Sequence, residues 1–304
     1  MRNRRKFIRN SGLVLSAATL GGLAACSSTD TGGGGNGGGD GDLLSQLQEA
    51  GTITVGFAGE APYSFEEDGE LTGATVALHR EIFGELGIDE VEGVAVDFGS
   101  LIPGLNAGRF DAVSAGMSIL PERCAEAAFT EPEFQYTTAL MVPEGNPEDL
   151  VDMNSFVDTD LTVATMTGAI ETDYAAQLGL NSIEVGGPQD GLDAINSGNA
   201  DAFALTGISL NWMAENSNVD VEVTETFVAD IDGVLQYGAG ATVFRDEEAS
   251  NSLLDAYNEV LAEIIADEDR YLSIVGDYGF TAEELPPEQM TTELLCEGDL
   301  DALQ

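Results

Sequence analysis

The sequence predicts an α/β protein with two lobes, each a mixed, mostly parallel sheet flanked by helices, joined by a two-strand hinge. Strand-length apolar runs alternate with helix-length amphipathic segments in residues 43–135, and the alternation begins again in residues 136–237. Residues 238–304 add a strand and then helices, so we expect them to return to the first lobe. Two β-prone crossings, residues 134–142 and 234–244, predict a hinge with a ligand cleft between the lobes.

The first lobe is expected to contain a βαβαβ unit. Its expected strands are residues 52–57, 91–98 and 110–115, and its expected helices are residues 43–49, 71–86 and 101–107. This order implies parallel strands with right-handed crossovers, and ligands of such sheets collect beyond the carboxyl ends of the strands. The loops at that edge hold Glu60, Tyr63, Phe98, Ser118 and Arg123.

The second lobe is expected to repeat the pattern. Its expected strands are residues 161–165, 182–185 and 202–205, and its expected helices are residues 171–178 and 191–197. The loop before the first of these helices ends at Ile170, and Thr206 follows the third strand. In the returning segment, the expected strand is residues 241–244 and the expected helices are residues 252–265 and 271–275.

The turn Gly-Met-Ser-Ile-Leu-Pro-Glu-Arg at residues 116–123 follows a buried strand. Pro121 suits the first turn of a helix, and Glu122 is favourable at a helix N-terminus. Arg123 therefore stands beside a helix N-terminus, where its fork can hold a carboxylate through two parallel charge-assisted hydrogen bonds. The alternative, a surface Arg paired with one of the many acids, stays open from these residues alone.

The charge of the chain is far from balanced, with 55 acidic residues against 10 basic ones and a formal net charge of -45. Half of the basic residues precede position 10, and the others are Arg80, Arg109, Arg123, Arg245 and Arg270. Nucleic acid is excluded as a partner because no basic footprint can form. Such charge destabilises a compact state in dilute buffer, whereas in 1 M salt the Debye length falls to about 3 Å and screens the repulsion. We therefore expect a halophilic prokaryote as the source; an acidic secreted protein from ordinary salt is the alternative.

The N-terminus has the features of an export signal. Twin Arg residues at 4 and 5 precede an apolar run, residues 11–25, that is too short to span a membrane and resembles the core of a Tat-type signal. The motif Leu-Ala-Ala-Cys resembles a lipobox, so we expect residues 1–26 to be a lipoprotein signal and Cys26 to be lipidated. Residues 27–42 are Gly-rich and are expected to be a flexible tether. The predicted location is therefore outside the cell, on the outer face of the membrane, with the lipid as the only membrane contact.

Cysteine and histidine usage limits the chemistry. Cys124 and Cys296 remain once Cys26 is lipidated, and outside the cell two Cys favour a disulfide, with two buried free thiols as the alternative. His79, the only His, is expected on the surface of a helix, so neither a metal site nor His-based catalysis is expected and no cofactor is predicted. We expect Trp212 to pack against other side chains rather than stack on a ligand.

Several motifs together resemble the family 3 extracellular solute-binding proteins of ABC importers. They are Gly-Met-Ser-Ile-x-x-x-Arg at residues 116–123, Phe-Gly-x-x-Ile-Pro-Gly-Leu at 98–105, Phe-Thr-x-Pro at 129–132, Tyr-Gly-Phe at 278–280 and Asp-Ala at 201–202. The resemblance covers roughly residues 45–296. It implies a type II periplasmic-binding-protein-like fold and a monomer that captures a small polar ligand, mostly an amino acid, and delivers it to a permease without catalysis.

The resemblance also implies roles for individual residues. Ser118 and Arg123 match the positions that bind the ligand α-carboxylate, together with a backbone N–H near Gly116, and Phe98 matches a stacking position. The family usually places an Asp for the α-ammonium group where this chain has Thr206. A conventional α-amino acid therefore lacks its usual ammonium acceptor here.

Further motifs look like the ectoine/hydroxyectoine-binding subgroup. They are Gly-Glu-Ala-Pro-Tyr at residues 59–63, Ile-Pro-Gly-Leu-x-Ala-Gly-Arg at 102–109, Pro-Glu-Arg-Cys-Ala at 121–125 and Leu-Leu-Cys at 294–296. Ectoine is a cyclic amidinium carboxylate, and its delocalised cation suits aromatic faces and carboxylates. The resemblance implies such roles for Tyr63, Phe98, Glu60 and Glu171, whereas Ser118 replaces one aromatic of the subgroup. The complete expected ligand set is Glu60, Tyr63, Phe98, Gly116, Ser118, Arg123, Ile170, Glu171 and Thr206.

Other functions and roles stay open from the sequence. The ligand can be a generic polar or acidic amino acid, and an enzyme of another class, a dehydratase on the same scaffold, would use Glu60 or Glu171 as general acid or base. A tethered sensor domain is a third class. Glu60 can be a solvated loop acid, Tyr63 and Phe98 core aromatics, and Glu171 a residue that favours a helix N-terminus.

Overall fold

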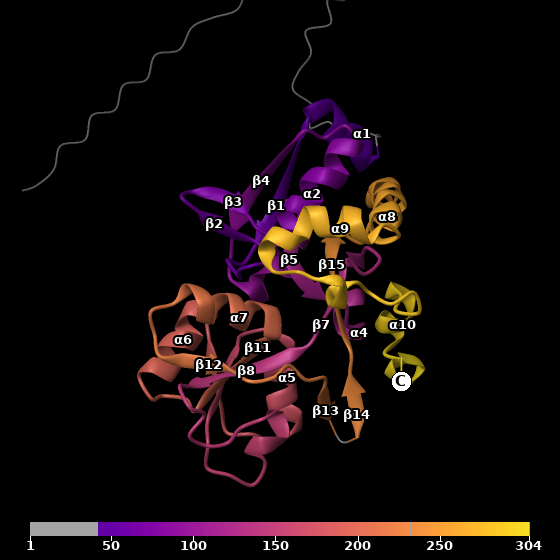
Figure 1. The fold of residues 1–304 in the computed structure, drawn as a ribbon. Helices are drawn as coiled ribbons and strands as arrows, with labels where there is room; N and C mark the ends of the chain where they lie inside the picture. The colour runs from indigo at the N-terminus through magenta and orange to yellow at the C-terminus, as the bar shows by residue number, and fades with distance from the viewer. Residues whose placement is uncertain (1–41, 232, 304) are drawn as a thin grey trace, which may run out of the picture. The chain divides into compact units, whose positions relative to one another are not determined.

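The computed structural model describes residues 42–231 and 233–303 (Figure 1). The expected signal peptide, Cys26 and the tether up to residue 41 lie outside the described residues. Two separate mixed sheets flanked by helices form the two lobes of the expected α/β fold. Among the described helices, none has the length and apolar character needed to cross a membrane.

The first sheet contains three parallel strands and an antiparallel strand that comes after the second sheet in the chain, with two short strands paired to it. Its strands are β1 (Thr52–Phe57), β4 (Glu90–Ala95), β5 (Ala112–Ser118), β6 (Ala128–Phe129), β7 (Phe134–Tyr136) and β15 (Gly238–Phe244). The order is β4-β1-β5-β15-β6, with β7 also paired to β15. β4 and β5 run parallel to β1, whereas β15 runs antiparallel to β5, β6 and β7. The strand β15 therefore belongs to the first sheet although it follows the second sheet in the chain.

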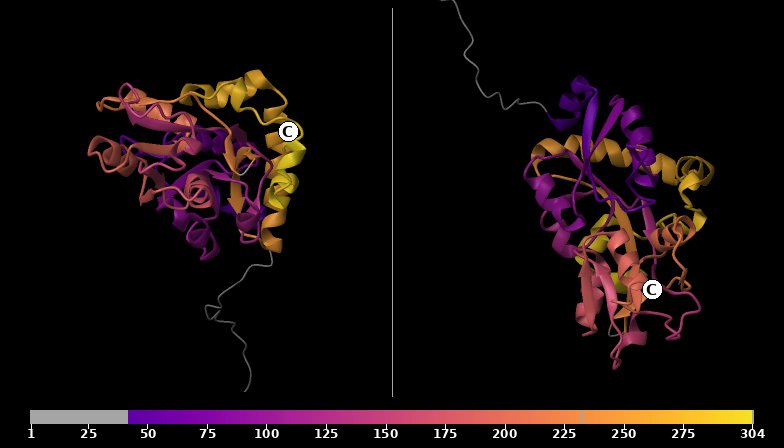
Figure 2. Two further views of the ribbon diagram at one scale, coloured as in Figure 1. Left: turned by 90° about the horizontal axis from the view of Figure 1, so that it is seen from below. Right: turned by 90° about the vertical axis from the view of Figure 1, so that its left-hand side faces the viewer.

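Helices cover the first sheet because apolar residues point alternately to its two faces. The helices around it are α1 (Leu43–Ala50), α2 (Ala74–Glu85), α3 (Leu101–Asn106), α8 (Asn251–Ile265) and α9 (Glu268–Val275). On β5, Ala112 packs in one hydrophobic cluster with α2 and α8, and the next residue, Val113, packs in a second cluster with α3. Figure 2 shows the C-terminal helices beside the N-terminal ones, and α2 contacts both α8 and α9 although they are far apart in the sequence.

The second sheet follows the predicted pattern in the middle of the chain. Its strands are β8 (Thr138–Pro143), β9 (Val163–Met166), β10 (Ser182–Val185), β11 (Ala202–Thr206) and β12 (Val221–Val223), in the order β10-β9-β11-β8-β12. β9 pairs in parallel with β10 and β11, whereas β8 is antiparallel to β11 and β12. The helices of this lobe are α5 (Ile170–Gln177), α6 (Pro188–Asn196) and α7 (Gly207–Asn216).

The chain passes between the two sheets twice. It leaves β7 and enters β8 at Thr137, and it returns through the hairpin of β13 (Ala229–Ile231) and β14 (Val234–Gln236) to β15. The segment expected as one long β-prone crossing is thus divided between the two sheets. Tyr136 pairs with Gly238, so the outgoing and returning strands lie side by side at the crossing. The lobe boundaries expected at 135/136 and 237/238 stay predictions.

The remaining elements are short. They are the hairpin β2 (Phe65–Glu67) and β3 (Glu70–Thr72), helices α4 (Pro121–Cys124) and α10 (Thr292–Glu297), and the 3-10 turns η1 (Phe98–Ser100), η2 (Met153–Phe156), η3 (Glu248–Ser250), η4 (Gly276–Tyr278), η5 (Ala282–Glu284) and η6 (Leu300–Leu303). A disulfide joins Cys124 in α4 to Cys296 in α10, with 5.7 Å between their Cα atoms. Pro121 opens α4, as its fixed φ angle favours.

Three expectations about local structure are wrong. The helix expected from residue 71 starts at Ala74, because residues 70–72 form a strand of the β2–β3 hairpin. The strand expected to reach Phe98 ends at Ala95, and Phe98 opens a 3-10 turn. His79 is fully buried rather than on the surface, because α8 and α9 cover α2. Its Nε2 hydrogen-bonds to the Thr242 hydroxyl of the first sheet.

Candidate functional site

A small cavity of about 20 Å³ lies between the two sheets at the carboxyl ends of their parallel strands. Its walls come from Glu60, Tyr63, Phe98, Gly116, Ser118, Tyr136, Met166, Ala169, Ile170, Glu171, Leu205 and Thr206. Every residue of the expected ligand set lines this cavity except Arg123, which donates a hydrogen bond to the Ser118 carbonyl. Such a volume holds about one water molecule, so the lobes are closed on each other.

Arg123 connects the two lobes beside this cavity. Its Nη1 donates to the Ser118 carbonyl at 3.0 Å, and its Nη2 donates to the Gly168 carbonyl of the second lobe at 2.9 Å. The guanidinium carbon lies 5.7 Å from the centre of the Phe98 ring. Within the described residues Arg123 forms no ion pair, unlike Arg245 and Arg270, which pair with carboxylates. Its positive charge is therefore available to a ligand carboxylate.

Tyr63 forms an aromatic wall. Its ring packs against Phe134 and Phe280, with ring centres 5.3 and 5.8 Å apart, and the side chain is 1% exposed. Gly116 has φ of +58°, and a Cβ there would lie 2.8 Å from the Tyr63 ring. Glycine is therefore required at this position both for the backbone conformation and for the ring that covers it. The buried Tyr63 hydroxyl lies near Thr206 without an ordinary hydrogen bond to a described residue.

Two buried carboxyl groups reach the cavity from opposite lobes. Glu60, 4% exposed, comes from the loop after β1, and its Oε1 accepts from the Ser209 hydroxyl at 2.6 Å and from the Thr206 hydroxyl at 3.5 Å. Glu171, 1% exposed, lies in the first turn of α5, and its Oε1 is 3.5 Å from the Thr138 hydroxyl. Neither forms a salt bridge within the described residues.

Burial shifts the protonation of both groups towards neutral pH. Burial raises the pKa of Glu60 to about 7, the charge of Glu171 adds to this, and the hydrogen bonds from Ser209 and Thr206 oppose it. Burial likewise raises the pKa of Glu171 to about 7, against the effect of a backbone N–H and of Arg123. A cation between the two carboxyl groups would favour their ionised forms, so this end of the cavity suits a positively charged ligand group.

The structure adds two residues that sequence reasoning missed. Tyr136, the last residue of β7, lines the cavity, and its hydroxyl donates to the Ser118 hydroxyl. Nothing marked it in the sequence, because its segment was interpreted as one continuous crossing. Ser209, fully buried in the first turn of α7, holds Glu60. Its position three residues after Thr206 was the available signal, since both belong to the carboxyl edge of β11.

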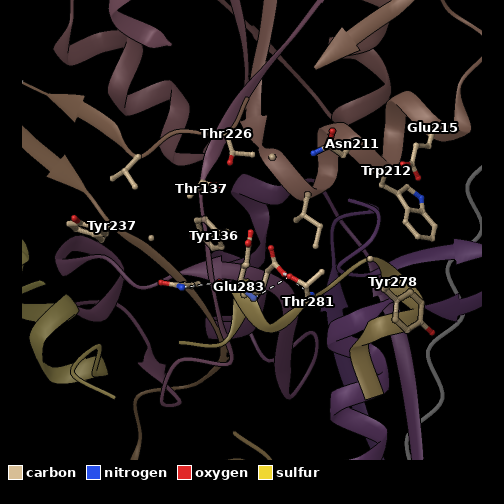
Figure 3. A pocket seen from close by; sticks show the side chains of 17 residues that line it. Tyr136, Thr137, Asn211, Trp212, Glu215, Thr226, Tyr237, Tyr278, Thr281 and Glu283 are labelled. Atoms are coloured by element: carbon tan, nitrogen blue, oxygen red, sulfur yellow. Dashed lines mark hydrogen bonds between the residues drawn. The ribbon is translucent and has the colours of Figure 1, made fainter. Parts of the chain in front are cut away.

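A larger cavity of about 530 Å³ lies nearby, between α7, the crossing strands and the segment around η4 and η5 (Figure 3). Asn211, Trp212 and Glu215 of α7 line one side, and Tyr278 and Glu283 line the other. None of the expected ligand residues lines it, so we place the candidate site in the smaller cavity.

Two observations bear on the other expectations. Trp212 packs against Phe65 of β2 with ring centres 5.9 Å apart, so it contributes packing as expected. Among the described side chains, no three His, Cys, Asp or Glu residues are grouped to hold a metal ion.

Comparison with known proteins gives consistent matches. The model of the bacterial extracellular solute-binding proteins, family 3, matches residues 53–275. The probable amino-acid ABC transporter periplasmic-binding protein y4tE of Sinorhizobium fredii is 34% identical over 262 residues, which cover 83% of this chain and 85% of that protein. The L-cystine-binding protein TcyA of Bacillus subtilis is 26% identical over 257 residues, or 82% of this chain and 89% of its own. Among solved structures, EhuB in complex with hydroxyectoine superposes with a TM-score of 0.74 and 30% identity, covering 84% of this chain and 97% of EhuB.

Proposed function

The chain belongs to the bacterial extracellular solute-binding proteins of family 3, and from this premise we propose that it captures ectoine or hydroxyectoine and delivers it to an ABC importer. The family match and the relatives show a solute-binding protein of the amino-acid ABC transporter type.

One observation carries the choice of ligand: a cavity lined by two buried carboxyl groups lies beside an arginine, and none of the three side chains forms an ion pair within the described residues. Arg123 offers the carboxylate-binding fork, and Glu60 and Glu171 offer two acceptors for one positive group. A zwitterion with a delocalised cation complements this arrangement, because its charge can be shared by two carboxylates and by aromatic faces. The position expected to receive an α-ammonium group is Thr206, which carries no charge.

The known proteins support this ligand and one competitor. EhuB, solved with hydroxyectoine, supports the ectoine class. TcyA is named for L-cystine, and Ser118 is the residue expected in ordinary amino-acid binders, so a polar amino acid is the second candidate ligand. The relatives are transporter components, which favours binding over the dehydratase-like alternative.

Capture requires the lobes to open. The cavity of about 20 Å³ is far smaller than any amino acid, so the ligand enters while the lobes are apart. Closure then brings Glu60 to α7 and Arg123 to the Gly168 carbonyl. A ligand shifts this equilibrium by its higher affinity for the closed form, which is the form a permease can distinguish from the open one.

The setting of the protein is part of the same proposal. We propose a monomer held at the outer face of the cell membrane by a lipid on Cys26, followed by a tether over residues 27–42. The net charge of -45 supports work in concentrated salt, where repulsion within the folded chain is screened. Mass spectrometry of protein extracted from membranes would test the lipid directly.

Calorimetric titration in molar salt tests the ligand. We expect saturable binding of ectoine or hydroxyectoine and much weaker binding of glutamine and glutamate. Binding of glutamate without binding of ectoine would reject the ectoine class and favour the amino-acid candidate. Turnover of a prephenate-like substrate would revive the enzyme alternative, with Glu60 or Glu171 as general acid or base.

A further inference from the structure

We propose that Ser209 is a positioning residue of the ligand site: its hydroxyl, carried by the second lobe, holds the Glu60 carboxyl of the first lobe and so couples lobe closure to recognition of the ligand cation. The proposal rests on the proposed function and adds a residue and a role to it.

The geometry places Ser209 at the point where the lobes meet. Its hydroxyl donates to Glu60 Oε1 at 2.6 Å, and Ser209 itself is fully buried. The two residues are 149 positions apart in the sequence. Glu60 belongs to the lobe of the first sheet, and Ser209 belongs to the lobe of the second sheet. The bond therefore exists only when the lobes are together.

Two hydroxyl groups of the second lobe donate to the same oxygen of Glu60. Ser209 and, at a longer 3.5 Å, Thr206 approach Oε1, which leaves Oε2 for a ligand group. A carboxylate near the N-terminal turn of α7 is also favoured by the helix dipole. The second lobe thus contributes an uncharged clamp to a carboxyl group that the first lobe provides.

The loop that carries Glu60 is well fixed, so the clamp acts on a defined group. The Ser64 N–H donates to the Glu60 carbonyl at 3.1 Å, and the Thr75 N–H and hydroxyl both bond to the Tyr63 carbonyl. These bonds hold the backbone around Glu60 within the first lobe. The remaining freedom is in the Glu60 side chain, and Ser209 removes it on closure.

The other face of α7 offers a matched control. Asn211 is exposed and lines the larger cavity of Figure 3 rather than the ligand cavity. An Asn211→Ala variant truncates a polar side chain two residues from Ser209 in the same helix without touching Glu60. Any effect of Ser209→Ala that Asn211→Ala shares belongs to the helix and not to the clamp.

The experiment is a double-mutant cycle with ectoine as the probe, measured by calorimetry on the full chain in molar salt. We expect Ser209→Ala to weaken ectoine binding about 10- to 100-fold, the range for a hydrogen bond to a charged group, and Asn211→Ala to change it less than twofold. In a Glu60→Ala background, which has no side-chain acceptor for Ser209, adding Ser209→Ala should change the affinity less than twofold. Ser209→Thr, which keeps the hydroxyl, should restore affinity to within a few-fold of the natural protein.

Equal losses of ectoine affinity from Ser209→Ala in the Glu60 and Glu60→Ala backgrounds would overturn the proposal. A Ser209→Ala variant that binds ectoine within twofold of the natural protein would also overturn it. If the natural protein does not bind ectoine, the proposed ligand fails, and X-ray scattering of the ligand-free protein then decides this inference. A larger radius of gyration for Ser209→Ala than for Asn211→Ala would support the clamp. Equal radii would reject it.

Discussion

Among the described residues, buried glutamates occur in two regions: within the first lobe, and in the cleft that holds the proposed ligand site. Glu133 lies in the first lobe and is 1% exposed, and burial raises its pKa to about 7, as it does for Glu60 and Glu171 in the cleft. Its Oε1 accepts from the Thr242 hydroxyl at 2.5 Å, the Thr242 N–H at 3.1 Å and the Tyr257 hydroxyl at 2.7 Å. All of these donors belong to the same lobe.

The cleft glutamates have fewer donors, and those of Glu60 come from the opposite lobe. Glu60 receives one short hydrogen bond and one long one, and Glu171 receives a hydroxyl at 3.5 Å. Burial and a raised pKa therefore do not identify a binding carboxyl group. The distinguishing feature is the position between the two lobes: the donors of Glu60 come from the opposite lobe, whereas those of Glu133 lie in its own lobe although its Oε2 has no partner among the described residues.

Loss of Arg123 should produce the largest loss of ligand affinity, and this loss should be confined to the cleft. We expect Arg123→Ala to weaken binding of any carboxylate ligand by at least about 100-fold, because a desolvated carboxylate would lose its charged partner. Calorimetry in molar salt measures this. Arg245→Ala is the matched control, since it removes one cation that is already paired with Glu247, and it should leave ligand affinity unchanged. Unchanged affinity in Arg123→Ala would place the carboxylate elsewhere.

Substitution of Glu133 should show the opposite profile from substitution of Glu171. We expect Glu133→Ala to lower the free energy of unfolding by about 3 kcal/mol, because buried donors of Thr242 and Tyr257 lose their acceptor. Ligand affinity should change less than twofold. Glu171→Ala should weaken ligand binding at least tenfold and leave the free energy of unfolding unchanged or higher, because an unpaired buried carboxyl group is removed.

Denaturant unfolding and calorimetry on the same two variants, both in molar salt, give the comparison. The comparison holds if Glu133→Ala lowers only the free energy of unfolding and Glu171→Ala lowers only the ligand affinity. A larger loss of ligand affinity in Glu133→Ala than in Glu171→Ala would break the comparison.

The sequence predicts the strands and turns that border the cleft better than it predicts which side chains are buried there. Strand-helix alternation yields both sheets, and the turn at residues 116–123 places Ser118 and Arg123 where the structure has them. Glu60 and Glu171 came from family motifs, because a carboxylate in an acidic chain carries no local signal of burial. Glu133 was missed for the same reason.

Tertiary packing explains the other failures. His79 lies on a helix whose pattern allows either face outward, and only the return of α8 and α9 across the first sheet buries it. The clamp by Ser209 depends on the approach of the two lobes, which no spacing within the chain encodes. Apart from the Cys124–Cys296 disulfide, contacts between segments more than a hundred residues apart are therefore the part that the sequence alone did not provide.

The pH dependence of stability should separate the two regions. Burial raises the pKa of Glu133 from 4.5 to about 7, so between these values the folded chain keeps a proton that the unfolded chain has lost. The free energy of unfolding then falls as pH rises, by at most about 1.4 kcal/mol per pH unit for each such group. Glu60 and Glu171 act in the same direction without ligand. His79 acts in the opposite direction below pH 6.5, since burial lowers its pKa to about 3.

Saturating ectoine should remove the contribution of Glu60 and Glu171 to the pH dependence of the unfolding free energy, because a bound cation favours their ionised forms. The contribution of Glu133 should remain. We therefore expect the fall in unfolding free energy between pH 5 and 7 to become shallower with ligand. Glu133→Gln should make it shallower still, with or without ligand. Unfolding curves at several pH values measure both slopes. A slope that ligand leaves unchanged would contradict the assignment of the cleft glutamates.

The smallest expected effect comes from Gly168, where the backbone of the second lobe lies close to the backbone of the first. Gly168 has φ of +82°, and a Cβ there would lie 3.0 Å from the Gly99 Cα. Gly179, in the same lobe, has φ of +66° with nothing within 4 Å of such a Cβ. Alanine at either position incurs about 1 kcal/mol of left-handed strain, but only Gly168→Ala hinders closure.

We expect Gly168→Ala to weaken ectoine binding about three- to tenfold, a range that corresponds to about 0.7–1.4 kcal/mol, and Gly179→Ala to change it less than twofold. Both should lower the free energy of unfolding by similar amounts and leave the part of the pH slope due to Glu133 intact. The comparison of affinities by calorimetry thus isolates closure from backbone strain. Equal affinities for the two variants would mean that the contact between Gly168 and Gly99 does not limit closure, and the distinction between the regions would then rest on the glutamates and their donors alone.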